Sequence, residues 1–167
     1  LRIADALYRS GNAEEALPYV ESLSEYSGDP GLVADISLTL GRVYQETDRH
    51  RQALRLFSRI PERMATQPGY RAVYYHRGRS HYELKETERA LSELNSYLSF
   101  GETAELYYDA LFFKSLIIRK DDPDASRAGL FSVYERTAKR LVKRQAAEAI
   151  ADLYIASGDH VAALPFL

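Results

Sequence analysis

Residues 40–57 read LGRVYQETDRHRQALRLF and contain two small residues, Gly41 and Ala53, on either side of a polar turn. The same pattern recurs about every 37 residues along the chain. A small residue on each of two helices lets their axes approach closely, so that bulky neighbours interlock around the crossing. The pattern therefore predicts repeated pairs of antiparallel helices joined by short turns.

Both small positions can be followed through five units. The first falls at Ala4, Gly41, Gly78, Ser115 and Ala151. We expect the second at Ala16, Ala53, Ala90, Ala128 and Ala163. A leucine follows the second small residue in four units, and Gly129 replaces it in the fourth. Chance rarely keeps two such positions in register five times, so we interpret the chain as a helical repeat.

Helix-ending residues agree with this division. Glycines, N-cap side chains and prolines lie between the expected helices, at Gly11-Asn12, Asp48, Asp122-Pro123 and Gly158-Asp159. The predicted helices are 1–10, 13–27, 30–46, 49–60, 68–84, 87–99, 103–120, 123–136, 139–157 and 160–167. The boundary near Thr137 has neither Gly nor Pro. Pro18 and Pro165 fall inside predicted helices, which we expect each of them to bend.

The repeat resembles the tetratricopeptide repeat (TPR) family. Leu40-Gly41-x-x-Tyr44, followed by Ala53 and Phe57, is similar to the core signature of that family. The signature Trp is absent, and Ser37, Tyr74, Leu111 and Ala147 stand in its place. The resemblance implies an all-α, right-handed superhelix of about five helical hairpins. We expect one repeat domain, part of a longer chain, with units at 1–28, 29–66, 67–101, 102–137 and 138–167.

A weaker resemblance concerns a subfamily. Tyr26-Ser27-Gly28-Asp29-Pro30, placed before a new helix, is similar to segments of bacterial cell-envelope TPR proteins, such as outer-membrane assembly lipoproteins and Tol–Pal-associated proteins. This resemblance favours a bacterial periplasm or cell envelope as the compartment and leaves the cytoplasm as the alternative.

Composition excludes several classes of protein. The chain has no Cys, so disulfide frameworks, thiolate catalysis and thiolate metal sites are excluded. The net charge of −2 argues against a generically basic nucleic-acid binder. No apolar run approaches the roughly 18 residues of a membrane span, so we expect no direct membrane insertion.

Chemistry-bearing motifs are missing as well. His76 and His81 lie about 140° apart around a helix, so they cannot share a metal ion. Asp121, Asp122 and Asp124 lack the spacing of a calcium loop. The sequence contains neither a nucleophile elbow nor a phosphate-binding loop. We therefore expect no catalytic residue, no metal and no cofactor.

One stripe on the first helix of each unit mixes aromatic, Arg and carboxylate side chains, because residues at i, i+4 and i+7 share a helix face. The resemblance places this stripe in the concave groove of a TPR superhelix. Tyr and Arg are common in interface hot spots, and Arg42 and Arg79 could bind acidic side chains. The candidate partner-binding residues are Asp5, Tyr8, Arg9, Leu38, Arg42, Gln45, Tyr75, Arg79, Tyr82, Phe112, Leu116, Arg119, Glu148 and Asp152.

Structural explanations compete with this hypothesis. An Arg on the stripe can simply pair with a carboxylate of a neighbouring repeat, such as Asp35 or Glu46. Most tyrosines are explained by helix packing. Two basic runs, Arg51/Arg55/Arg59 and 136–144, are better explained as solvated faces, because they lack the Gly and aromatic residues of nucleic-acid surfaces.

The sequence thus predicts a non-enzymatic scaffold that binds a protein or peptide segment, with an acidic partner as one option. Alternatives are an accessory domain of a larger enzyme, such as a peptidoglycan-acting one, and a structural stacking module. Val161, Leu164 and Leu167 would lack a covering repeat, so we expect missing sequence or a second copy of the chain to cover them. The second case would make a homo-oligomer.

Overall fold

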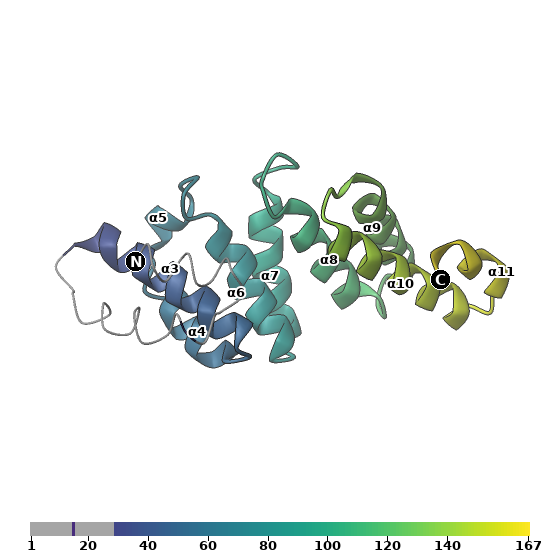
Figure 1. Cartoon of the computed structure of the whole chain (residues 1–167), viewed down its shortest axis with the longest axis horizontal. Coiled ribbons are helices and arrows are strands. Elements are labelled where there is room, and N and C mark those ends of the chain that lie inside the picture. Colours follow the sequence, from purple (N-terminus) through teal and green to yellow (C-terminus); the bar gives the residue numbers. More distant parts are fainter. Residues whose placement is uncertain (1–14, 16–28) are drawn as a thin grey trace. The chain divides into compact units, whose positions relative to one another are not determined.

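The computed structural model describes residue 15 and residues 29–167, shown in colour in Figure 1. Every regular element within these residues is a helix. The predicted all-α class is therefore confirmed. The chain divides into two compact units, Leu1–Glu86 and Thr87–Leu167, and each is described by itself. The predicted helices 1–10 and 13–27, with Ala4, Ala16 and Pro18, lie outside the described residues.

The first unit contains α3 (Pro30–Glu46), α4 (His50–Phe57), the short α5 (Glu62–Ala65) and α6 (Ala72–Glu83). Helix α4 packs against both α3 and α6. The buried face of α4 carries Ala53 and Phe57, both fully inaccessible to solvent. The core of this unit therefore lies where α4 meets the two longer helices (Figure 1).

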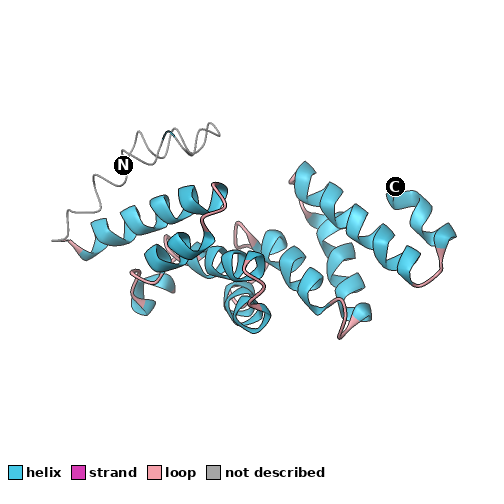
Figure 2. Cartoon of the chain, turned by 90° about the horizontal axis from the view of Figure 1, so that it is seen from below, coloured by secondary structure: helices cyan, strands magenta, loops and turns pink. Residues whose placement is uncertain are grey.

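The second unit contains α7 (Thr87–Leu98), α8 (Tyr107–Ile118), α9 (Pro123–Arg136), α10 (Arg140–Ala156), α11 (His160–Ala163) and the 3-10 helix η1 (Leu164–Phe166). Each helix from α7 to α11 packs on the next along the chain. Figure 2 shows helices joined by short loops throughout. Leu130, Val133 and Ile150 form the centre of the core, with Phe131, Tyr154 and Phe166 packed against it.

Small residues allow the predicted close crossings. A Cβ atom at Gly41 would overlap the ring of Phe57, so α3 and α4 can approach this closely only because residue 41 is glycine. Ala53, Ala90 and Ala163 are buried in the same way on their own helices. The described small positions are therefore buried as the repeat pattern predicts, with one exception.

The exception is Ala128, which was expected at the second small position of the fourth unit and is exposed. Ser126 is the residue buried there, and its hydroxyl donates to the carbonyl of Ser115 at 2.8 Å. Counted from the helix N-cap, Ser126 matches Ala53: Asp122 caps α9, and Arg49 occupies the N-cap of α4. The prediction was wrong by two residues because it followed the alanine rather than the helix start.

Three turns between helices end in the same way. Asp48, Lys85 and Gly158 all have a left-handed backbone, with φ of 56°, 63° and 81°. In each turn the next amide donates to a carbonyl five residues earlier, as in the bond from Arg49 to Tyr44 at 2.7 Å. This is the Schellman pattern that satisfies the last carbonyls of a helix.

Helix limits agree with the predictions in part. The ranges 30–46 and 123–136 are confirmed. Helix α9 ends before Thr137, whose ψ of 134° is extended. The range 68–84 was too long, because α6 begins at Ala72, and α5 forms where a break was expected. Pro165 does not bend an α-helix: α11 ends at Ala163, and Pro165 lies in η1. None of the described helices is long and apolar enough to cross a membrane.

Candidate interaction surface

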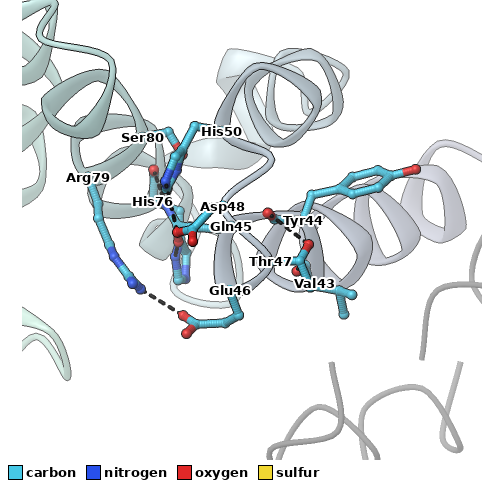
Figure 3. A network of polar contacts seen from close by, with 10 residues as sticks. All are labelled: Val43, Tyr44, Gln45, Glu46, Thr47, Asp48, His50, His76, Arg79 and Ser80. Carbon is cyan, nitrogen blue, oxygen red and sulfur yellow. Dashed lines mark hydrogen bonds and ion pairs between the residues drawn. The ribbon is translucent and has the colours of Figure 1, made fainter. Parts of the chain in front are cut away.

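The predicted stripe of the first unit lies on α3 and α6. Leu38, Arg42 and Tyr82 are half-buried there. Arg79 of α6 donates to Glu46, the last residue of α3, at 2.7 Å. This cross-repeat ion pair is visible in Figure 3. The structural explanation of Arg79, a pairing with Glu46, is therefore confirmed.

Gln45 lies in the interior. Its amide nitrogen donates to the carbonyl of His76 and to the hydroxyl of Ser80, both at 2.8 Å, and its amide oxygen lies 2.9 Å from His76 Nδ1 (Figure 3). Only 1% of Gln45 is exposed. These bonds fasten the end of α3 to α6, because a buried amide needs its partners. The sequence pattern indicated the face of Gln45 but not that a neighbouring helix covers it.

Two aromatic members of the stripe are buried too. Tyr75 meets the ring of His76 edge-on, with centroids 5.1 Å apart. Phe112 belongs to the core of the second unit. Both side chains contribute packing rather than accessible surface.

In the second unit the stripe continues on α8 and α10. Arg119 pairs with Asp152 at 3.7 Å, and Glu148 pairs with Arg144 at 3.5 Å on the same helix. Leu116 is half-buried against the core cluster. The Arg119–Asp152 pair joins the first helices of consecutive repeats, as Arg79–Glu46 does, with the polarity of the charges reversed. Asp5, Tyr8 and Arg9 lie outside the described residues.

Hydrogen bonding and burial raise the pKa of two tyrosine hydroxyl groups in the first unit. Tyr70 donates to Asp35 at 2.7 Å, and this hydrogen bond raises the pKa of Tyr70 to about 12. Burial raises the pKa of Tyr82, with a smaller contribution from the negative charge of Glu83. Asp35 therefore accepts from a tyrosine rather than from an arginine of the stripe.

Across residues 29–167 no cluster of three or more His, Asp or Glu side chains could hold a metal ion. His81 instead lies 2.7 Å from Glu86, next to the left-handed turn at Lys85. This contact therefore connects the end of α6 to the turn that follows it.

Comparison with known proteins agrees with this geometry. Residues 7–74 match the sequence model described as tetratricopeptide repeat. The helical-repeat fold is TPR-like. A crystal structure of MamA superposes with a TM-score of 0.72 at 18% identity, covering 98% of this chain and 90% of that one.

Two further solved structures have similar TM-scores. BtubC (BKLC) from P. vanneervenii gives a TM-score of 0.72 at 16% identity, covering 98% of this chain and 74% of that one. A variant of a kinesin light chain protein from Podosopora anserina, with nearly identical TPR-like repeats, gives 0.73 at 14% identity, covering 99% and 88%. At these identities the likeness concerns the fold. A search of curated proteins finds no match.

Proposed function

We propose that this chain is a TPR-type scaffold without catalytic activity that binds a protein segment on the exposed part of its first-helix stripe. In the first unit this surface consists of Leu38, Arg42, Arg79 and Tyr82. In the second it consists of Leu116, Arg119, Glu148 and Asp152. Gln45, Tyr75 and Phe112 support it from below, since all three are buried.

The cross-repeat ion pairs are the observation that carries this proposal. Arg79–Glu46 and Arg119–Asp152 occupy related repeat positions in the two units and hold charged groups at the surface in fixed geometry. Charges already held in place lose less conformational entropy when a ligand binds. Paired groups at the surface therefore suit recognition better than freely moving ones.

The partner that fits is a segment with both carboxylate and apolar side chains. A guanidinium carries five N–H donors in a rigid fork, so an arginine held by one carboxylate can still donate to a second. Leu38 and Leu116 supply half-buried apolar contact beside the charges. A mixed surface of this kind is typical of interfaces with exchangeable partners.

A charge swap tests the proposal. The double variant E46R/R79E retains an ion pair and leaves the net charge of the chain unchanged, but it inverts the polarity offered to a ligand. The matched control E102R/R136E inverts another pair, in which Arg136 bonds both oxygens of Glu102 away from the stripe. Circular dichroism and thermal unfolding verify that both variants fold.

Pull-down from native extract, followed by cross-linking of the recovered partner, is the readout. We expect E46R/R79E to lose the partner by tenfold or more, on the order of the cost of one charged contact at an interface. The control should recover it as the wild type does. Equal recovery with all three proteins would contradict binding on this stripe.

A second role is favoured by the end of the second unit. Val161, Leu164 and Leu167 are 78%, 66% and 82% exposed. We propose that either further sequence or a second copy of the chain covers these residues, and the second case makes the scaffold a homo-oligomer. A role in the bacterial envelope, proposed from residues 26–30, is tested by locating the natural protein in fractionated cells.

A further inference from the structure

A row of arginines on α4 takes no part in the stripe described above. Arg51 and Arg55 lie one helical turn apart on α4, and Arg59 follows in the turn after its end, where the amide of Arg59 still donates to Leu56. All three are exposed. A helix rises about 6 Å in four residues, so the backbone positions of Arg51 and Arg55 lie about 6 Å apart along α4.

These three arginines have no anionic partner in the described part of the chain. None of the three side chains has an ion pair or hydrogen bond within the described residues. Other cations of the described residues do pair with carboxylates, in the bridges Arg77–Glu62, Arg79–Glu46, Arg119–Asp152, Arg127–Asp124, Arg136–Glu102, Lys139–Asp109 and Arg144–Glu148. Like charges one turn apart repel each other in a helix, and only Arg55, in the last turn of α4, gains from the negative end of the helix dipole.

The repeat itself shows that packing does not demand arginine here. Counted from the buried small residue, the three positions correspond to Glu88, Ser92 and Ser96 on α7. On α9 they correspond to Asp124, Ala128 and Ser132. Helices with the same buried face therefore carry acidic or small residues outside, and the row is specific to one repeat.

The residues around the row limit the class of partner that it can bind. The only large apolar side chains that are exposed in the described residues lie on other elements, so α4 offers nothing to insert into a lipid surface. Its outward face also has no aromatic residue on which a nucleic-acid base could stack. Arginine rather than lysine favours bidentate contact with carboxylates.

We propose that the outer face of α4 is a second interaction surface, which binds an acidic protein segment through Arg51, Arg55 and Arg59. Its occupant carries carboxylates about 6 Å apart, the spacing of Glu residues at every fourth position of a helix. This surface is separate from the first-helix stripe, so either can fail without the other.

Titration with a defined probe tests the proposal. The probe is a fluorescent synthetic helix with Glu at every fourth position in an Ala background, and binding is followed by anisotropy at about 50 mM salt, where surface charges are weakly screened. The variant R51Q/R55Q/R59Q removes the row. The control K120Q/R140Q/K143Q removes the same number of positive charges from exposed positions elsewhere.

We expect the wild type and the control to bind the probe alike and the row variant to bind at least tenfold more weakly. R51K/R55K/R59K, which keeps the charge but not the fork, should bind several-fold more weakly than the wild type and remains informative if the glutamine variant unfolds. Equal losses in the row and control variants, or the absence of wild-type binding, would overturn the proposal. The proposal would also be overturned if oligothymidine or phosphatidylglycerol vesicles bound more tightly than the peptide probe and this binding depended on the arginine row.

Discussion

Lys85 has a backbone conformation that residues with a Cβ atom rarely adopt. Its φ of 63° matches those of Asp48 and Gly158 at the corresponding turns. Glycine adopts this conformation without steric cost, whereas it costs other residues about 1 kcal/mol. The turn therefore carries local strain at two of these three positions, compensated by the Schellman hydrogen bonds.

Replacing Lys85 by Gly should therefore raise the free energy of unfolding, by about 0.5–1 kcal/mol. Urea denaturation measures the change. The Lys85 ammonium also lies 5.4 Å from the ring centre of Tyr82, and Lys85→Ala separates the two effects, since it loses this contact but keeps the strain. A glycine variant no more stable than the alanine variant would refute the explanation.

Tyr70 should make the stability depend on pH in the alkaline range. Its pKa is raised to about 12 by the hydrogen bond to Asp35, against about 10 in an unfolded chain. A raised pKa means that the fold favours the neutral phenol. The stabilisation is therefore complete below pH 10 and disappears between about pH 10 and 12.

The measurement compares the wild type with Tyr70→Phe in urea. We expect a difference of about 0.5–1 kcal/mol at pH 8, because the bond is exposed to solvent, and a smaller one at pH 11. Asp35→Asn is the control and should weaken the pH dependence. A constant difference across this range would show that Tyr70 does not titrate as described.

At the scale of the element, two helix crossings depend on a small residue and the ring or side chain that fills the space beside it. Gly41 and Phe57 make this pair in the first unit. In the second unit Gly129 and Ser126 lie against Ser115 instead. Different residues thus achieve the same close approach.

Gly41→Ala tests this close approach. Alanine favours helix by up to about 1 kcal/mol, yet we expect the variant to be destabilised by about 1–3 kcal/mol, because its methyl group overlaps the Phe57 ring. Adding Phe57→Leu should recover part of that loss. Gly69→Ala, where a Cβ meets nothing within 4 Å, is the neutral control.

The repeat pattern predicted the positions of the helices better than it predicted which side chains are exposed. Two small positions and the capping residues were enough to place α3 and α9, because helix ends depend on local hydrogen bonds. Ser126 was missed although the N-cap at Asp122 marked its place. Gln45, Tyr75 and Phe112 were predicted to line the groove but are buried, because which neighbour covers a helix face depends on contacts between repeats.

At the scale of the whole molecule, each of the two units has a core of its own, and the second ends in an apolar surface. Leu167 occupies the repeat position of Phe57, Leu94 and Leu130, all of which are fully buried. Leu167 itself is 82% exposed. A residue at a core position of the repeat therefore lies at the surface of the second unit.

Association through this end should depend on concentration. Light scattering after size exclusion is expected to show a species larger than one chain at high concentration. The variant V161S/L164S/L167S should shift it toward the single chain, because it removes most of the exposed apolar area. A single chain at every concentration would exclude this interface, and unchanged association in the variant would place it elsewhere.

The left-handed turns have a consequence for how the protein is made. Each one closes within six residues, and the helices that it joins are neighbours along the chain, so little chain entropy is lost in forming a hairpin. Proteins dominated by such local contacts fold in microseconds to milliseconds. A hairpin leaving the ribosome can therefore form its turn before the following one has been synthesised, and its remaining apolar face is covered once the next repeat packs on it.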